Sequence, residues 1–321
     1  MGDGRSGVRH RAGAAVVVAL AALLAACGGG TASLPAAGPA SSASGTTSLP
    51  VAPDPLPQPV QRLDIVATEY TFTMTPPPPG ALRPGWTLLT FHNAGAEAHQ
   101  VMFARIKDGV NMTELAAAAA NDSSGAGAIA FVDMIGGVSY IDAGKDITAL
   151  VNLTEGAVMA MCYVPDATGV AHALKGMTNA LTVSGETTGE AASRPELVGA
   201  SVDGTIELTK DGYRFPERMG RGWYHVRNTD DALHEVSLMR LGGSLSDDRT
   251  AMLVEDLAAN RTPPVTLEAY GGMGAISAGF DGYLHLDLAP GDYLAVDFMP
   301  DPGRPRPHML DGYWARFRVE R

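Results

Sequence analysis

Short segments in which apolar and polar residues alternate recur from residue 61 to the end of the chain. Gly, Pro, Asn and Asp, which favour turns, separate them, and this pattern is typical of strands. We predict strands at 63–68, 86–92, 100–105, 146–153, 158–164, 179–183, 205–208, 222–227, 235–240, 283–288, 293–299 and 314–319. Glycine-rich runs such as residues 271–274 are interpreted as turns. The pattern predicts an all-β fold with many short strands.

Two stretches depart from this alternation and have the composition of helices, 112–120 and 249–259. Each lies in a long connection between two predicted strands, and the two occupy corresponding places in the two halves of the chain. We therefore expect one short helical insertion in each half.

The chain repeats itself at a fixed spacing. In each half an Asn stands six residues before a His, and 63 positions separate that His from a Cys in the first half and an Asp in the second. The matched pairs are Asn93 and Asn228, His99 and His234, Gly156 and Gly291, Cys162 and Asp297, His172 and His308, and Gly176 and Gly312. These spacings, which agree between the halves to within one residue, predict two copies of one domain, residues 61–185 and 197–321, joined by a linker at 186–196.

The first 27 residues have the pattern of a targeting segment. Arg5, Arg9 and Arg11 precede an apolar run that is too short for a membrane span and that ends in small residues before Cys27. This order resembles the bacterial lipobox, in which the Cys is lipidated. Residues 28–60 are rich in Pro, Ala, Ser and Gly, and we interpret them as a disordered, flexible tether.

The formal net charge of the chain is −12, and removal of residues 1–26, with three Arg and one Asp, leaves 20 basic and 34 acidic residues. This acidic balance argues against binding to nucleic acid. The lipobox predicts instead that Cys27 anchors the protein to the outer face of a bacterial cell membrane.

Cys162 is the only Cys after Cys27, and it begins a loop that continues through His172 and Met177. His99 is a candidate for a second, upstream imidazole. A thiolate, two imidazoles and a weak axial thioether are the ligand set of a blue-copper electron-transfer site. Taken singly, a buried Cys or Met is more often a core residue, so the hypothesis depends on the ordered set.

Both halves resemble cupredoxins, the Greek-key β-sandwiches that contain blue copper. Nine residues separate Cys162 from His172 and four separate His172 from Met177, a spacing similar to that of the ligand loop of copper nitrite reductases. The resemblance implies one type 1 copper ion, bound by His99, Cys162, His172 and Met177. It also implies that Asn93 ties the two ligand loops together.

The second half departs from this pattern, since Asp297 replaces the Cys and Tyr313 replaces the Met, while His234 and His308 remain. Two His and an Asp are a weak second candidate site, able to hold Cu(II) or Zn(II). The alternative is a purely structural role, in which Asp297 meets a donor such as Arg304 or Arg306 and this domain serves for packing or docking.

The sequence lacks the His-X-His pairs by which multicopper enzymes bind further copper, so an enzyme is not expected. The leading hypothesis is a one-electron carrier that serves an extracytoplasmic redox partner protein. Two alternatives stay open: a copper-handling protein without redox cycling, and a metal-free tandem sandwich that binds a partner at the cell surface.

Overall fold

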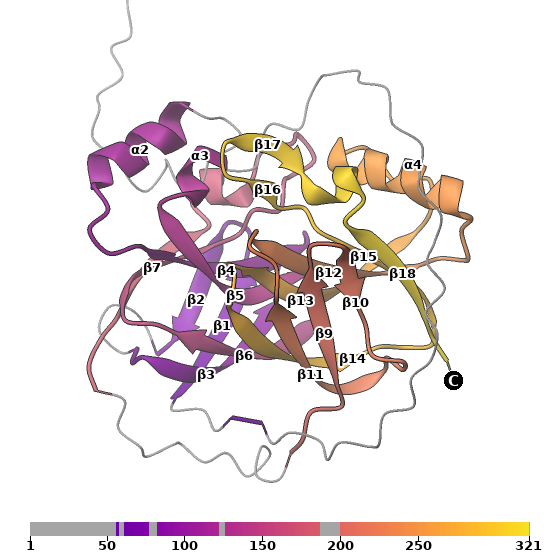
Figure 1. The fold of residues 1–321 in the computed structure, drawn as a ribbon, viewed down its shortest axis with the longest axis horizontal. Helices are drawn as coiled ribbons and strands as arrows, with labels where there is room; N and C mark the ends of the chain where they lie inside the picture. Colours follow the sequence, from indigo (N-terminus) through magenta and orange to yellow (C-terminus); the bar gives the residue numbers. More distant parts are fainter. Residues whose placement is uncertain (1–55, 58–60, 77–81, 122–125, 187–199, 321) are drawn as a thin grey trace, which may run out of the picture.

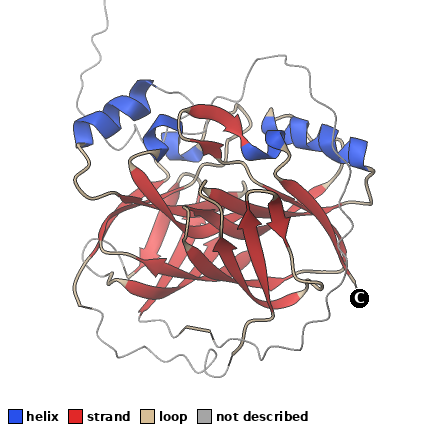
Figure 2. Cartoon of the chain, viewed as in Figure 1, coloured by secondary structure: helices blue, strands red, loops and turns tan. Residues whose placement is uncertain are grey.

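The computed structural model describes residues 56–57, 61–76, 82–121, 126–186 and 200–320. The targeting segment with Cys27, nearly all of the tether and most of the linker lie outside the described residues, so these assignments stay predictions. The described part is all-β with a few short helices, as predicted (Figures 1 and 2).

Two eight-stranded sheets form the body of the molecule. The first runs in the order β10 (Gly212–Arg214), β9 (Gly204–Thr209), β11 (Arg221–Asn228), β14 (Asp281–Asp287), β6 (Asp146–Leu153), β3 (Gly85–Asn93), β1 (Gln61–Thr68) and β2 (Thr71–Thr75). The second runs β18 (Trp314–Val319), β15 (Gly291–Val296), β12 (His234–Leu241), β13 (Leu267–Ile276), β5 (Val132–Ile141), β4 (His99–Ile106), β7 (Gly156–Met161) and β8 (Thr178–Val183). A small separate ribbon pairs β16 (Pro300–Asp301) with β17 (Arg304–Pro307).

Each half supplies four strands to each sheet, in matching order, so each half is a sandwich of its own, as the repeat predicts. The two sandwiches are joined edge to edge, because β6 pairs with β14 and β5 pairs with β13. The apolar side chains between the sheets form one core that contains residues of both halves. This joint pairs backbone groups that would otherwise be exposed along two sheet edges.

Several strands escape prediction from the sequence, above all β5 and β13 at the joint. The interpretation of residues 271–274 as a turn is wrong, since they lie inside β13. Most of this strand is buried, so it lacks the alternation that marks a half-exposed strand. Its glycines are there because the backbone of β12 approaches closely, with Gly272 at a φ of +145° against the carbonyl of Val236.

The helices α2 (Met112–Asn121), α3 (Ala126–Ile129) and α4 (Asp247–Ala258) confirm the two predicted insertions, the first of them in two pieces. They lie at one end of the sandwiches together with β16 and β17 (Figure 1). Two short 3-10 helices, η2 (His172–Lys175) and η4 (His308–Asp311), belong to the loops that follow Cys162 and Asp297. None of the described helices is long and apolar enough to cross a membrane.

Candidate metal centre

His99, Cys162 and His172 converge in the first half, and all three side chains are fully buried. His99 is the first residue of β4, where a bulge against β5 shifts the register between His99 and Val101. Such bulges re-aim a side chain at the end of a strand. The strand β7 ends at Met161, earlier than the predicted end at residue 164, so Cys162 is the first residue after the strand.

The spacing of the three donor atoms fits one metal ion. The two Nδ1 atoms of the imidazoles lie 3.1 Å apart, and Cys162 Sγ lies 3.5 Å from Nδ1 of His172 and 4.0 Å from Nδ1 of His99. The point equidistant from these atoms is therefore about 2.1 Å from each, which is close to metal–nitrogen and metal–sulfur bond lengths. The donor set, a thiol and two imidazoles, is that of a type 1 copper site.

Backbone hydrogen bonds fold the Cys162 loop back on itself. The amide of Ala173 donates to the carbonyl of Cys162 at 2.8 Å, and the amide of Cys162 donates to the carbonyl of Met177 at 3.2 Å. Gly176, in the left-handed conformation with φ 106°, ends η2 and turns the chain back. Met177, the predicted axial ligand, is thereby fully buried and adjacent to Cys162 through the backbone.

The electrostatics of the cluster suit a cation. Burial lowers the pKa of both imidazoles and so favours their neutral form, which has one ring nitrogen available to bind a metal. Burial also raises the pKa of the Cys162 thiol to about 12, so a thiolate requires a bound cation. On the outer side, Nε2 of His172 lies 2.8 Å from a carboxylate oxygen of Glu97, close enough for an ion pair but without the geometry of a hydrogen bond.

Asn93 holds the turn that carries His99 into place. Its buried side chain donates to the carbonyls of Glu97 (2.8 Å) and Ile141 (2.9 Å) and accepts from the amide of Gly95 (3.0 Å). These bonds tie the turn to the end of β5, whereas the resemblance implied a tie to the Cys162 loop.

The matched residue Asn228 makes the same three hydrogen bonds in the second half, so a substitution there is a control for the same substitution at Asn93. Asn93→Ala and Asn228→Ala should each lower the free energy of unfolding by about 3 kcal/mol, since each leaves buried polar groups without partners. Urea unfolding measures this loss. In copper-loaded protein only Asn93→Ala should weaken the copper site, and an equal effect of both variants on the visible spectrum would contradict this assignment.

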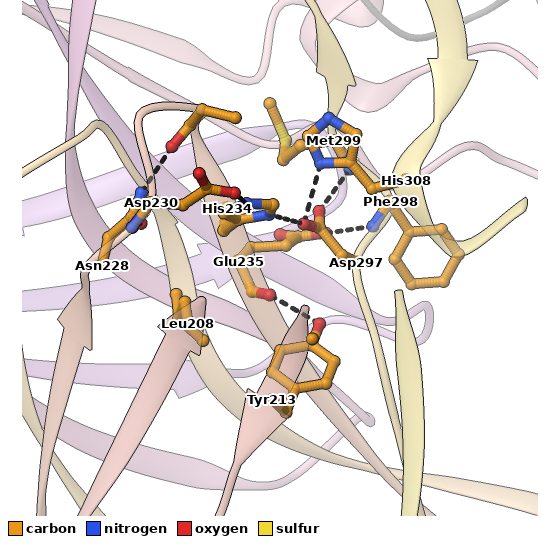
Figure 3. Close-up of polar contacts among 12 residues, drawn as sticks. Leu208, Tyr213, Asn228, Asp230, His234, Glu235, Asp297, Phe298, Met299 and His308 are labelled. Atoms are coloured by element: carbon orange, nitrogen blue, oxygen red, sulfur yellow. Dashed lines mark hydrogen bonds and ion pairs between the residues drawn. The ribbon is translucent and has the colours of Figure 1, made fainter. Parts of the chain in front are cut away.

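The weak second candidate set also converges, as Figure 3 shows. Asp297 Oδ2 lies 2.7 Å from Nδ1 of His234 and 3.0 Å from Nδ1 of His308. The outer Nε2 atoms meet two carboxylates that the sequence did not reveal, Asp230 at 2.9 Å and Asp301 at 3.1 Å. Within the described residues, this cluster and that of Cys162 are the two groups of three or more His, Cys, Asp or Glu donors that converge.

The expectation that Asp297 meets Arg304 or Arg306 is wrong. Both arginines pair with Asp311 instead, and Arg304 also lies 3.6 Å from Asp301. The partners of Asp297 are the two imidazoles and the amide of Met299, which donates to Oδ1 at 2.8 Å.

A cavity of about 510 Å³ lies between the two clusters, lined among others by Gln100, Tyr163, Glu235 and Phe298. Glu235 occupies the bulge of β12 that corresponds to Gln100 in β4, and its side chain accepts from the amide of Phe298 at 3.0 Å. Burial and then the charge of Asp297 raise the pKa of Glu235 to about 8.

Because the pKa of Glu235 is raised, the free energy of unfolding is expected to fall as the pH rises. The folded state holds the proton of Glu235 more tightly than the unfolded state, so the stabilisation is complete at acidic pH and is lost as the pH rises through 8. Glu235→Gln should relieve roughly 3 kcal/mol of this loss at pH 9, measured as Tm against pH. The exposed control Glu217→Gln should leave the profile unchanged.

In Glu235→Gln, a smaller fall of Tm with rising pH should remain, and we attribute it to His308. Burial lowers the pKa of His308, but the bonds and charges of Asp297 and Asp301 outweigh it and raise the pKa to about 9. The stabilisation from this imidazolium is therefore lost as the pH rises through 9. A Glu235→Gln profile identical to that of the native protein would contradict the assignment to Glu235.

No protein-family model matches the chain, and no curated protein is detectably similar to it in sequence. Similar solved structures include auracyanin from Roseiflexus castenholzii (15% identity, 40% of this chain and 100% of that chain, TM-score 0.27). A second is the blue copper oxidase from Nitrosomonas europaea (14% identity, 81% of this chain and 85% of that chain, TM-score 0.22). A third is the copper-containing nitrite reductase from Thermus scotoductus (12% identity, 81% of this chain and 62% of that chain, TM-score 0.22). The last two are copper enzymes by name. Because these TM-scores are low, the assignment of the metal centre rests on its own geometry.

Proposed function

We propose that this chain is a one-electron carrier that holds a type 1 copper ion on His99, Cys162, His172 and Met177. The observation that carries the proposal is the convergence of Sγ and two Nδ1 atoms on one point at bonding distance. This donor set accommodates both Cu(I) and Cu(II), so a bound copper ion would exchange one electron with little rearrangement. Complete burial of all four side chains keeps water out and holds the donors in place.

The surroundings of the imidazoles support transfer to a partner protein. Nε2 of His172 and of His99 lie 2.8 Å and 3.7 Å from Glu97 and Glu69, whose side chains are both 40% exposed. A single, partly exposed glutamate side chain thus separates the outer edge of each imidazole from solvent. Two carboxylates at this place favour a partner with a basic docking surface.

The location is part of the proposal and is supported by the sequence of residues 1–60. A lipidated Cys27 followed by a Pro- and Ser-rich tether would hold the sandwiches at the outer face of a bacterial cell membrane. The partner would then be another extracytoplasmic redox protein.

The visible absorption spectrum of residues 28–321, loaded with Cu(II) and desalted, tests the proposal. We expect an intense thiolate-to-copper charge-transfer band equivalent to one blue centre per chain, together with reversible one-electron reduction. Retained Cu(I) without reversible cycling would indicate a copper-handling protein. The absence of both the band and bound copper in the Cys162 cluster would indicate a metal-free binding module.

A further inference from the structure

The second half repeats the scaffold of the first cluster with different donors. The ring centroids of His234 and His308 are 4.9 Å apart, as are those of His99 and His172. The backbone bonds of the two ligand loops also match: His172 to Val164 and His308 to Met299, Ala173 to Cys162 and Met309 to Asp297, Met177 to His172 and Tyr313 to His308. The loop therefore keeps its conformation although the thiolate and the thioether have gone.

We propose that His234, Asp297 and His308 form a binding site for a divalent cation of borderline hardness, Zn(II) or Cu(II). The two Nδ1 atoms and Asp297 Oδ2 face one another within 4.8 Å, and all three residues are buried (Figure 3). Donor atoms around a tetrahedral Zn(II) stand about 3.3 Å apart. The separations of 2.7 Å and 3.0 Å from Oδ2 need to open by only a few tenths of an ångström.

The outer carboxylates are the strongest sign of a metal site. Ligand histidines almost always donate their second ring N–H to a carboxylate or carbonyl, which fixes the tautomer and aims the other nitrogen at the metal. Asp230 and Asp301 do this for His234 and His308, so both Nδ1 atoms are directed at the same space.

The donor types select the kind of ion. A carboxylate is a harder ligand than a thiolate, and Tyr313, stacked on His234 with ring centroids 4.1 Å apart, stands in the place of the axial Met. Soft ligands stabilise Cu(I), so their absence favours ions that stay divalent. The site is thus non-blue, since it has no thiolate, and it is independent of whether the first cluster binds copper.

A variant without the first cluster, Cys162→Ser, isolates this site for measurement. At pH 8, after Zn(II) loading and desalting, we expect it to retain one Zn(II) per chain. Loaded with Cu(II) instead, it should give an electron paramagnetic resonance spectrum with coupling to two imidazole nitrogens and no charge-transfer band from sulfur. Because the metal displaces protons from the imidazoles, the affinity should fall as the pH is lowered to 6.

Further substitutions in Cys162→Ser should lower its metal affinity to different extents. Asp297→Asn is nearly isosteric and should abolish metal retention, while Asp230→Asn, which removes only an orienting carboxylate, should weaken affinity about 10- to 100-fold. Asp281→Asn is the matched control, since Asp281 pairs with His225 at 2.6 Å outside the cluster, and it should leave affinity unchanged. Circular dichroism verifies that each variant is folded.

The proposal would be overturned if folded Cys162→Ser retained neither Zn(II) nor Cu(II) at pH 8. The cluster would then be a metal-free network in which protons on the imidazoles join the three carboxylates. It would also be overturned if metal were retained equally well after Asp297→Asn.

Discussion

Cys162→Ser is expected to abolish the visible charge-transfer band and the reversible redox activity of the copper-loaded protein. The band requires a thiolate bound to copper, and a serine hydroxyl neither ionises near neutral pH nor provides the soft donor that Cu(I) prefers. Without metal the variant should lose only about 1 kcal/mol in stability, because serine has nearly the shape of cysteine, although its shorter C–O bond leaves the hydroxyl poorly placed to bond Nδ1 of His172, which lies 3.5 Å from Sγ.

Two measurements separate the metal effect from a folding effect. The rise in Tm on adding copper should shrink in Cys162→Ser, while the Tm without copper stays close to the native value. Cys162→Asp is the matched control, because it introduces the donor found at Asp297, and we expect a bound divalent ion without the intense band. A band that survives Cys162→Ser would exclude Cys162 as the ligand.

Gly137→Ala is expected to lower the free energy of unfolding by more than about 3 kcal/mol, or to prevent folding. Gly137 has a φ of +128°, and a Cβ there would overlap the carbonyl oxygen of Val101 in the neighbouring strand β4. Relief of this overlap would push β4 away from β5, two residues beyond His99 at the bulge. The substitution should therefore also weaken the copper site.

Gly144→Ala provides the control for backbone conformation alone. Gly144 also has a positive φ, +75°, but nothing lies within 4 Å of a Cβ built there, so the cost should be about 1–2 kcal/mol. The corresponding residue of the second half, Gly272, meets the carbonyl of Val236 and should respond like Gly137. Urea unfolding of the three variants checks the ranking, and equal losses for Gly137→Ala and Gly144→Ala would refute the close-contact argument.

The half-exposed strands were predictable because their successive side chains point alternately to the core and to solvent. The structure places β6 and β18 at the predicted residues, Asp146–Leu153 and Trp314–Val319. β5 and β13 were missed for the opposite reason, since they are largely buried and carry glycines that resemble turn signals. Their role as the joint between the halves depends on pairing between residues more than 120 positions apart, which leaves no local pattern.

The sequence by itself determined the donor types and their order, because the constant spacing of 63 residues between the upstream His and Cys162 or Asp297 is a property of the chain. It also determined that the domain is repeated. Only the tertiary structure decided which groups surround the donors: Glu97 beside His172, and Asp230 and Asp301 beside the histidines of the second cluster. Turns and neighbouring loops bring these carboxylates to the imidazoles, and a hydrogen bond depends on distance and direction in space rather than on spacing along the chain.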